Sequence, residues 1–504
     1  MNLSLLLNGV EVKKIFQTMY GKMVTTHDVE VSKINYDSRK IGRSDMFVAI
    51  SGTGIDGHNF IQQAISNGAK VIVVENDKSI DDSFCMHTSV VKIVVNDSRI
   101  ALAKISANYF GNPSKKMKMI GVTGTNGKTT VTYLLKQMLE ASNEQNVKVG
   151  LIGTVSYFVG NQSFSASHTT PESLELHQLF YQMVENNCTH CVMEVSSHSL
   201  SQNRVYGIDF SVAVFTNLTQ DHLDFHTSME EYFKAKKILF DNLSEQSFSI
   251  LNFDSSYGKK IAENSKSQKI SFGILSSANL KAENINLSID GSTCEFKTNS
   301  TSIKINTNLV GSFNISNLLA AYGVIVAMKI NFKKNIEVVF ANLQPAIGRF
   351  QKIDSPFGWK AIIDYAHTPD ALENCLIAIR QTIKNSDLII TIFGAGGDRD
   401  KTKRPLMGEI ADKLSDKIVV TSDNPRTENA EKIIDDILIG ISRTENVFVD
   451  VDRHDAIFRG LSLAETGDVI LIAGKGHEDY QVIGKEKIHF NDIEVVEEFI
   501  EANK

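Results

Sequence analysis

Residues 120–130, which read IGVTGTNGKTT, decide the fold of the middle of the chain. An apolar run enters a glycine-rich turn, and a helical pattern follows Lys128 and Thr129. Glycines allow backbone N–H groups to converge on phosphate oxygens at the start of a helix. A lysine here can reach the β- and γ-phosphates, and the hydroxyl after it can bind Mg²⁺. The stretch therefore predicts a strand, a phosphate-binding loop and a helix around a nucleoside triphosphate.

The spacing of the glycines is a variant of the common phosphate loop. The strict spacing needs a glycine at position 122, which is Val122 here, and the glycines are at 121, 124 and 127. The alternative is a glycine turn that binds nothing, and the flanking strand and helix argue against it. The predicted nucleotide contacts are Gly124, Thr125, Asn126, Gly127, Lys128, Thr129 and Thr130.

Length and composition indicate a multidomain globular protein. A chain of 504 residues is too long for one hydrophobic core, so two to four domains are expected. The net charge of −7 argues against nonspecific binding of nucleic acid. Five cysteines without a framework of spacings indicate reduced thiols in a cytoplasm, and Cys188 and Cys191 are predicted to be buried thiols. The N-terminus does not resemble a signal peptide and no segment reaches transmembrane length, so integral membrane contact is not expected.

Alternating strand and helix patterns predict α/β domains. Residues 70–75 and 90–95 look like short buried strands of a small first module. A Gly-Asn-Pro-Ser break at 111–114 indicates a boundary, and helical character ends again at 344–350. A polar, strand-rich stretch at 280–310 is expected to form an accessory sheet. We predict three domains, over residues 1–98, 99–345 and 346–504.

Four strand-and-loop units follow the second boundary. They read AIIDYAHTPD, LIITIFGAGGDRD, IVVTSDNPR and VILIAGKGHED. Each places polar residues just after an apolar strand, where open α/β sheets bind ligands. The last domain is therefore predicted to carry a ligand site at the carboxyl ends of its strands.

Two polar residues of the central domain also follow predicted strands. Glu194 lies in MEVSSH and His222 lies in TNLTQDHLDFH. With Thr129, they are predicted to converge on a metal ion, because phosphoryl transfer needs Mg²⁺ to neutralise charge on the phosphate oxygens. Alone, either residue would more often be a strand-end carboxylate or a packed histidine. Their combination with the loop favours function.

Many separate motifs resemble those of the Mur ligases of peptidoglycan synthesis, which share the loop variant with folylpolyglutamate synthases. In chain order they are DSR (37–39), TTPES (169–173), EVSSHSLSQNRV (194–205), FTNLTQDHLDFH (215–226), YFKAKKILF (232–240), GSFNISN (311–317), GRFQ (348–351) and DYAHTPD (364–370). The resemblance covers nearly the whole chain and is to the branch that adds the third peptide residue. It implies a UDP-binding N-terminal domain, a central P-loop ATPase-like domain and a C-terminal Rossmann-like domain that binds an amino acid.

The resemblance further implies an ATP-dependent amide ligase. Its substrates would be UDP-N-acetylmuramoyl-L-alanyl-D-glutamate, meso-2,6-diaminopimelate and ATP, joined through an acyl phosphate by a cytoplasmic monomer that uses Mg²⁺. The positions that match contacts of the nucleotide-linked dipeptide are Ser38, Thr169, Thr170, Ser196, Gln202 and Arg204. The positions outside the loop that match ATP contacts are Asn314, Arg349, Asp364 and His367. Domain closure is expected to accompany turnover.

Lys236 is expected to be carbamylated, which makes it N6-carboxylysine. The resemblance implies that this carboxylate supports a second Mg²⁺, and a neutral lysine amine can capture CO₂ and exchange a cation for an anion. Spacing alone would favour a solvated helix lysine. The resemblance thus implies a catalytic set of Lys128, Glu194, His222 and Lys236, and a metal set of Thr129, Glu194, His222 and Lys236. His222 is expected to bind metal rather than act as the general base, and which group takes the amine proton stays open.

The amino-acid pocket is expected in the last domain. Matching positions are Arg399, Asp423, Asn424, Pro425, Arg426, Gly474 and Glu478. Diaminopimelate ends in a carboxylate beside an ammonium, whereas lysine ends in an ammonium alone. Arg426 can pair with that carboxylate, and Asp423 and Glu478 can balance the ammonium. Opposite a bare lysine side chain, Arg426 would be repulsive.

Three alternatives remain at this point. A lysine-adding ligase would share every central motif. A folylpolyglutamate synthase would share the loop but should lack DSR, EVSSH and DNPR, which are all present here. A nucleotide-binding scaffold without catalysis is the third alternative, and the intact Lys128, Glu194, His222 and Lys236 argue against it.

Overall fold

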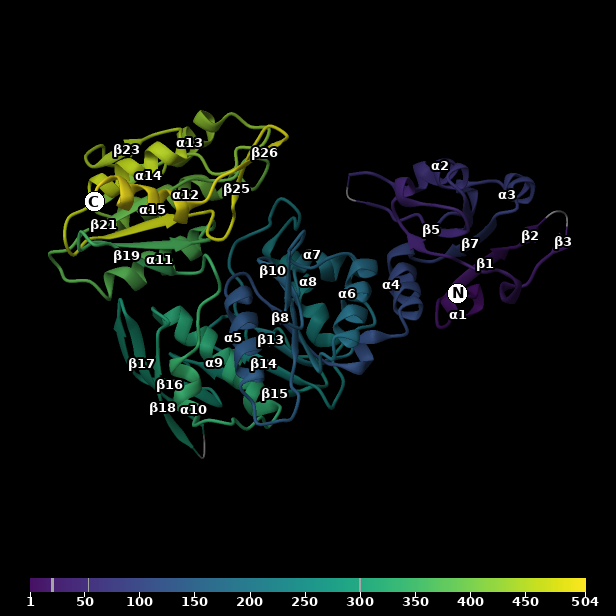
Figure 1. Cartoon of the computed structure of the whole chain (residues 1–504), viewed down its shortest axis with the longest axis horizontal. Coiled ribbons are helices and arrows are strands. Elements are labelled where there is room, and N and C mark those ends of the chain that lie inside the picture. The colour runs from purple at the N-terminus through teal and green to yellow at the C-terminus, as the bar shows by residue number, and fades with distance from the viewer. Residues whose placement is uncertain (20–21, 53, 299–300) are drawn as a thin grey trace. The chain divides into compact units, whose positions relative to one another are not determined.

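The computed structural model describes residues 1–19, 22–52, 54–298 and 301–504 (Figure 1). The chain forms two compact units. The first contains residues 1–121 and 146–211, and the second contains residues 122–145 and 212–504. Strands β8 (Lys118–Thr123) and β13 (Phe210–Phe215) have residues in both units. No described helix has the length and apolar character needed to cross a membrane.

The first unit begins with a five-stranded sheet in the order β1-β7-β6-β5-β4. Its strands are β1 (Val12–Phe16), β4 (Ile34–Asn35), β5 (Asp45–Val48), β6 (Ala69–Val74) and β7 (Val91–Val95), and β2 (Thr18–Met19) and β3 (Lys22–Met23) form a separate hairpin. Its helices are α1 (Leu3–Leu6), α2 (Ile61–Ser66), α3 (Asp82–Thr88) and α4 (Ser98–Tyr109), with 3₁₀ turns η1 (Thr26–Asp28), η2 (Ser38–Lys40), η3 (Gly57–Phe60), η4 (Asp77–Ser79) and η5 (Pro113–Lys116). The predicted strands at 70–75 and 90–95 are confirmed as β6 and β7.

Both faces of this sheet are buried, which explains the near-continuous apolar run in β6. Val71 and Val73 share a core with α1 and α4, whereas Ile72 and Val74 share a core with α2 and α3. β1 is antiparallel to β7, and the other pairs are parallel. The small first module is therefore a three-layer α/β fold, as its sequence predicts.

The rest of the first unit carries strands in the order β11-β10-β9-β12-β8. These are β9 (Val149–Ile152), β10 (Ser156–Val159), β11 (Gln162–Ser165) and β12 (His190–Glu194), with helices α6 (Ser173–Glu185) and α7 (Ser197–Ser201). Cys188 and Cys191 are buried cysteines beside and within β12. The prediction of buried thiols at a strand is confirmed.

The second unit carries strands in the order β13-β14-β15-β16-β17-β18. These are β14 (Phe248–Asn252), β15 (Gln268–Gly273), β16 (Leu280–Ser288), β17 (Gly291–Lys297) and β18 (Ser302–Thr307), with helices α5 (Lys128–Glu140), α8 (Met229–Asp241), α9 (Ser312–Ala327) and α10 (Ile336–Ala341). The predicted accessory sheet at 280–310 is antiparallel within itself, but β16 pairs with β15, so these strands extend the central sheet. Residues 299–300 of that stretch lie outside the described residues.

A six-stranded sheet completes the second unit, in the order β19-β20-β24-β21-β22-β23. Its strands are β19 (Gln351–Asp354), β20 (Lys360–Asp364), β21 (Ile389–Phe393), β22 (Lys417–Val420), β23 (Val447–Val449) and β24 (Val469–Ala473), and β25 (Tyr480–Ile483) and β26 (Glu486–His489) form a hairpin. Helices α11 (Pro369–Arg380), α12 (Lys403–Leu414) and α13 (Ala430–Leu438) share one core with the sheet, and α14 (Arg453–Ser462) and α15 (Asp492–Ala502) share the other.

The four predicted strand-and-loop units are β20, β21, β22 and β24. These strands are neighbours in the sheet and run parallel to one another. Their carboxyl ends therefore meet at one edge, and the four polar loops meet there with them. The two cores described above cover the two faces of these strands.

Candidate active site

The glycine turn after β8 leads directly into α5, as predicted. Gly124 has φ +152° and Gly127 has φ +86°. A Cβ atom at Gly124 would lie 1.9 Å from Thr216 Oγ1, and one at Gly127 would lie 2.3 Å from Asn317 Oδ1. The buried apolar residues of α5 follow the predicted helical spacing: Val131, Leu134, Leu135, Met138 and Leu139. Backbone conformation and close neighbours both require glycine in this loop.

Gly124→Ala is expected to lower the free energy of unfolding by about 2 kcal/mol and to weaken ATP binding, because the methyl group displaces Thr216 and the turn. Urea unfolding and calorimetric titration of ATP measure the two effects. Gly111→Ala is the matched control, because Gly111 also has a positive φ (+72°) but open space around its Cβ position. Equal ATP affinity in both variants would contradict the steric argument.

Lys128 and Lys236 meet at one carbonyl oxygen. Lys128 Nζ donates to Gly124 O at 3.0 Å and to Thr125 O at 2.8 Å, and Lys236 Nζ donates to Gly124 O at 2.8 Å. Lys236 is 1% exposed and its Nζ lies 4.4 Å from the centroid of the Tyr232 ring. Burial and the nearby Lys128 charge hold the pKa of Lys236 well below its usual value, against the opposite influence of Asp221. The alternative of a solvated helix lysine is wrong for Lys236.

Tyr232 lies between His222 and the glycine turn. The Tyr232 hydroxyl is 3.2 Å from Thr125 Oγ1, and its ring centroid is 6.1 Å from that of His222. His222 Nε2 lies 3.2 Å from Asp221 Oδ2. Burial alone would raise the pKa of Asp221, but His222 and the other nearby cationic groups outweigh it and lower that pKa to about 2. Asp221 is therefore an anion beside the glycine turn.

Two side chains from beyond residue 345, Arg349 and Asp370, reach the loop and its helix within the second unit. Arg349 Nη2 donates to Thr129 Oγ1 at 3.1 Å, and its guanidinium lies 4.6 Å from the Tyr365 ring centroid. Asn126 Nδ2 donates to Asp370 Oδ2 at 2.6 Å. The structure thus brings the predicted ATP residues Thr129 and Arg349 into direct contact.

The other three predicted ATP residues lie in buried positions around this contact. Asn314 accepts from Asn317, the residue next to Gly127, at 3.3 Å. Asp364 accepts from the backbone N–H of Phe350 at 2.6 Å, and burial raises its pKa against the influence of Arg349. Burial and the Lys403 charge lower the pKa of His367 to about 4, so its imidazole is neutral near pH 7.

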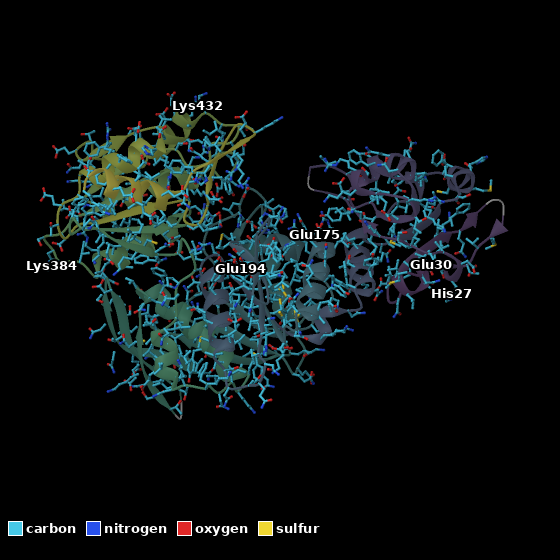
Figure 2. All side chains as sticks on the ribbon, in the orientation of Figure 1. His27, Glu30, Glu175, Glu194, Lys384 and Lys432 are labelled. Atoms are coloured by element: carbon cyan, nitrogen blue, oxygen red, sulfur yellow. The ribbon has the colours of Figure 1, made fainter. Side chains whose placement is uncertain are left out.

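Glu194 lies in the first unit at the end of β12 (labelled in Figure 2), fully buried. Its Oε1 accepts from Thr154 N at 2.8 Å and its Oε2 accepts from Thr154 Oγ1 at 3.0 Å. Thr169 Oγ1 lies 3.0 Å from Thr154 Oγ1, and Thr170 Oγ1 donates to Glu194 O at 2.8 Å. Ser196 N donates to Thr170 Oγ1 at 3.1 Å. Three predicted dipeptide contacts, Thr169, Thr170 and Ser196, therefore surround Glu194.

Arg204 belongs to the same group of contacts. Its Nη1 donates to Thr170 O at 2.8 Å and its Nη2 donates to Gln202 Oε1 at 2.6 Å. Glu172 lies 3.6 Å from Arg204 Nε. Ser38 has other partners, because it is buried in η2 and donates to Gln63 Oε1 at 2.8 Å. The first unit thus has one group of polar contacts around Glu194 and Arg204 and another at Ser38. A long ligand that is bound at both ends would suit these two groups.

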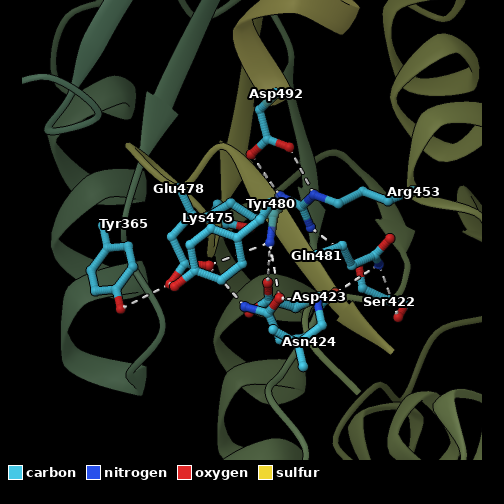
Figure 3. Close-up of polar contacts among 12 residues, drawn as sticks. Tyr365, Ser422, Asp423, Asn424, Arg453, Lys475, Glu478, Tyr480, Gln481 and Asp492 are labelled. Atoms are coloured by element: carbon cyan, nitrogen blue, oxygen red, sulfur yellow. Dashed lines mark hydrogen bonds and ion pairs between the residues drawn. The ribbon is translucent and has the colours of Figure 1, made fainter. Parts of the chain in front are cut away.

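A dense polar cluster occupies the edge where β20, β22 and β24 end (Figure 3). Asn424 Nδ2 donates to Glu478 Oε2 at 2.8 Å, and its Oδ1 accepts from Val482 N at 2.9 Å. Asp423 is 6% exposed, and Gly474 has φ +119° with its Cβ position 3.5 Å from Asp423 Oδ2. The structure brings together these four predicted diaminopimelate contacts.

Of the two predicted arginines, Arg426 is linked to this cluster through Val482, whereas Arg399 is exposed and contacts a residue outside it. Arg426 Nη1 donates to Gly397 O at 2.7 Å, and its backbone bridges to β25 through Val482. Arg399 Nη1 donates to Asp398 O at 2.8 Å. The side chain of Arg426 is half-buried rather than solvated, and Pro425 before it is buried.

No group of three or more His, Cys, Asp or Glu side chains among the described residues has an arrangement suited to a metal ion. The predicted metal set differs from such a group, because it contains a threonine hydroxyl and a modified lysine. Thr129, His222 and Lys236 belong to the second unit and Glu194 belongs to the first. The convergence of Glu194 with the loop therefore stays a prediction.

Family models and known proteins match the chain over almost all of its length. A model of the Mur ligase family catalytic domain matches residues 30–110, one of the Mur ligase middle domain matches 122–325, and one of the Mur ligase glutamate ligase domain matches 348–476. A protein of Clostridium botulinum named UDP-N-acetylmuramoyl-L-alanyl-D-glutamate--2,6-diaminopimelate ligase is 45% identical, with 99% of each chain covered. The chain belongs to the Mur ligase family.

Two further relatives extend this result. A protein of Phocaeicola vulgatus with the same name is 40% identical, and the match covers 98% of this chain and 99% of the relative. A solved structure of a UDP-N-acetylmuramoyl-L-alanyl-D-glutamate--2,6-diaminopimelate ligase superposes with a TM-score of 0.65 at 28% identity, over 95% of this chain and 96% of the other. The three-domain α/β fold of the Mur ligases is confirmed, while the domain bounds at 98 and 345 remain predictions.

Several residues of this Mur ligase join the candidate site without having been predicted for it. Lys475 lies in AGKGHE between the predicted Gly474 and Glu478, and a buried lysine has no periodic signal that separates it from an exposed one. Tyr232 lies in the motif YFKAKKILF and Asp221 lies in FTNLTQDHLDFH, so these motifs are the sequence signal that could have identified both residues. Asn317 ends GSFNISN, and its contact with Gly127 follows only from the packing of α9 against α5.

Proposed function

We propose that this Mur ligase joins meso-2,6-diaminopimelate to UDP-N-acetylmuramoyl-L-alanyl-D-glutamate with ATP as the energy source. The observation that carries the proposal is the full-length match, at 45% identity, to a protein named for this reaction. The gathering of the predicted amino-acid contacts at one sheet edge supports it. A lysine-adding ligase is not favoured, because the relatives quoted above are all named for diaminopimelate.

The reaction needs activation of a carboxylate, because a carboxylate is a poor electrophile for an amine. An oxygen of the terminal D-glutamyl carboxylate attacks the γ-phosphorus, and ADP leaves as the acyl phosphate forms. The deprotonated amine of diaminopimelate then attacks the carbonyl carbon, the C–O bond breaks, and phosphate leaves with the former carboxylate oxygen. The products are the amide, ADP and phosphate. The protein contributes mainly position and electrostatic stabilisation.

The second unit supplies the nucleotide side of this reaction. Backbone N–H groups of the glycine turn and the start of α5 point toward an anion in such a loop. Lys128 lies over the turn with its ammonium on Gly124 O and Thr125 O, from which it can move to a phosphate oxygen. Arg349 on Thr129 adds a second cation. Asn314, Asp364 and His367 complete the proposed ATP contacts.

The first unit supplies contacts for the nucleotide-linked dipeptide. The hydroxyls of Thr169 and Thr170, the backbone N–H of Ser196 and the guanidinium of Arg204 belong to one group of polar contacts. Such donors suit a peptide that ends in carboxylates. Ser38 in η2 is the proposed contact near the uracil.

The residues proposed for Mg²⁺ fit its preference for oxygen ligands. Thr129 offers a hydroxyl, Glu194 a buried carboxylate, and a carbamate on Lys236 would offer two more oxygens beside the loop. His222 would complete the set. Bound Mg²⁺ would neutralise charge that develops on the transferring phosphoryl oxygens.

Lys236 is suited to carbamylation by its surroundings. Burial and Lys128 favour the neutral amine, which is the form that attacks the carbon of CO₂. Loss of a proton from nitrogen then leaves an N-carboxylate. The change replaces a neutral amine near Lys128 with an anion, so the ammonium of Lys128 gains a partner of opposite charge. We therefore propose that Lys236 is modified to N6-carboxylysine. We also propose that the enzyme is a cytoplasmic monomer.

The test of this function is phosphate release with ATP, Mg²⁺ and the UDP-linked dipeptide, with either diaminopimelate or L-lysine added. Diaminopimelate-dependent release with little lysine-dependent release is the expected result. Equal release with both amino acids would indicate a relaxed ligase. Release with tetrahydrofolate and glutamate would indicate a folylpolyglutamate synthase, and no turnover with any set would indicate a nucleotide-binding scaffold.

Arg426→Ala is expected to raise the KM for diaminopimelate by about 10²-fold and to leave the KM for ATP nearly unchanged. The variant loses the guanidinium that pairs with the distal carboxylate but not the loop that binds nucleotide. Steady-state kinetics with each substrate varied in turn measure both constants. Equal loss for both substrates would indicate a folding defect and contradict the role of Arg426.

A further inference from the structure

Lys475 is a buried cation inside the proposed amino-acid pocket (Figure 3). It follows β24, is 0% exposed, and its Nζ lies 3.5 Å from Asp423 Oδ1 and 3.3 Å from Glu478 Oε2. It also donates to Asn424 Oδ1 at 3.2 Å. The two carboxylates proposed to bind the ammonium of the substrate therefore already share one ammonium from the protein.

The neighbouring Arg453 does not change this balance, because it is neutralised separately. Its Nε and Nη2 each donate to Asp492 at 2.8 Å, and both side chains are 0% exposed. Its remaining donors hold Ser422 O and Ala473 O at the ends of β22 and β24. Arg453 and Asp492 thus form a neutral pair that fixes the strand ends around Lys475.

The net charge of the pocket follows from the remaining groups. Asp423 and Glu478 supply two carboxylates, and Lys475 supplies one ammonium. Burial and the Asp423 charge raise the pKa of Glu478, against the opposite influence of Lys475 and Asn424. Burial alone would raise the pKa of Asp423, but Lys475 and Arg453 outweigh it and lower that pKa. One net negative charge is left for an incoming ammonium, and Arg426 provides one positive charge nearby for an incoming carboxylate.

We propose that Lys475 is a specificity-determining residue, because it sets the pocket charge so that only a side chain with both an ammonium and a carboxylate is balanced. The proposal rests on the proposed function. Arg399 is exposed to solvent and is left out of the count. With diaminopimelate the buried groups and the half-buried Arg426 then sum to zero, whereas with lysine they carry one excess positive charge. Without Lys475 the balance is reversed, because lysine would leave the site neutral and diaminopimelate would leave one excess negative charge. An unbalanced charge in a buried site is costly.

Lys475→Met is therefore expected to lower the preference for diaminopimelate over L-lysine, measured as the ratio of kcat/KM values, by at least about tenfold. The KM for diaminopimelate should rise while the KM for ATP stays near the wild-type value. Lys417→Met is the matched control in the same domain, since Lys417 Nζ donates to Leu463 O at 2.9 Å. Its preference should equal that of the wild type.

The decisive comparison uses Glu478→Gln alone and together with Lys475→Met. The single variant leaves the site with excess positive charge, so it should use diaminopimelate poorly. The double variant restores the balance, so it should use diaminopimelate about tenfold better than Glu478→Gln alone. A purely structural role of Lys475 predicts the opposite, namely that the second substitution adds further damage. This comparison also decides the matter if Lys475→Met alone does not fold.

The possible results of these assays distinguish the role of Lys475 from the proposed ligase function. A wild-type enzyme that releases phosphate with diaminopimelate, together with an unchanged preference in folded Lys475→Met or a double variant worse than Glu478→Gln, would overturn the role of Lys475 only. A wild-type enzyme that releases no phosphate with diaminopimelate would overturn the proposed function and this inference with it.

Discussion

Lys128→Ala is expected to reduce ligation by about 10³-fold or more, because the variant loses the charge that stabilises the transferring phosphoryl group. The fold should persist. Lys128 is half-buried at the first position of α5, and its ammonium contacts the carbonyl oxygens of Gly124 and Thr125 rather than the apolar core. Phosphate release under saturating substrates measures the loss, and thermal unfolding followed by circular dichroism measures the fold.

Lys136→Ala is the matched control for this variant. Lys136 lies in the same helix and pairs with Glu140 four residues later, a type of contact that contributes about 0.5 kcal/mol or less. It should keep wild-type turnover. Turnover near the wild-type rate in a folded Lys128→Ala protein would contradict the assignment of Lys128 to the phosphates.

Lys236→Ala is expected to reduce ligation by about 10²-fold or more, because the site loses the proposed N-carboxylate beside the glycine turn. Partial rescue by added acetate or formate is expected, since a small carboxylate can enter the space that the side chain leaves. The free energy of unfolding is expected to fall by about 2 kcal/mol, because the change removes the methylene groups of a side chain that is 1% exposed and leaves a cavity. Activity with and without added carboxylate measures the rescue.

Two further measurements bear on the modification itself. Lys234→Ala, in the same helix, should behave as the wild type, because Lys234 is exposed and pairs with Glu231. Wild-type activity should fall when CO₂ is removed from the buffer and return with bicarbonate. Activity that is indifferent to CO₂, with no rescue of Lys236→Ala, would contradict carbamylation.

Much of the fold was predictable because its signals are local. The strand, turn and helix around residues 120–130 follow from glycine spacing and apolar periodicity, and all of them are present. The four apolar runs of the last domain predicted strands followed by polar loops, and the structure shows that these strands are parallel neighbours in one sheet. The strand-rich character of the stretch 280–310 was predicted, but its attachment to the central sheet was not, because the pairing of β16 with β15 joins residues that no local pattern connects.

The candidate site was also predictable only in part. Residue types and motif positions predicted the members of each group, including Thr129 with Arg349 and Asn424 with Glu478. The burial of individual lysines could not be predicted, because lysine side chains are mostly exposed. Lys236 and Lys475 are lysines in helical or glycine-rich contexts, yet both are almost fully buried, because a carbonyl oxygen accepts from the amine of Lys236 and carboxylate oxygens pair with the ammonium of Lys475.

The central claim is that ATP activates the D-glutamyl carboxylate as an acyl phosphate before the amine attacks. The most direct test starts from UDP-N-acetylmuramoyl-L-alanyl-D-glutamate with ¹⁸O in the terminal carboxylate and follows the label by mass spectrometry during turnover with diaminopimelate. One ¹⁸O atom in each released phosphate is the predicted result, because phosphate leaves with the bridging oxygen. Unlabelled phosphate formed together with the amide product would contradict the account.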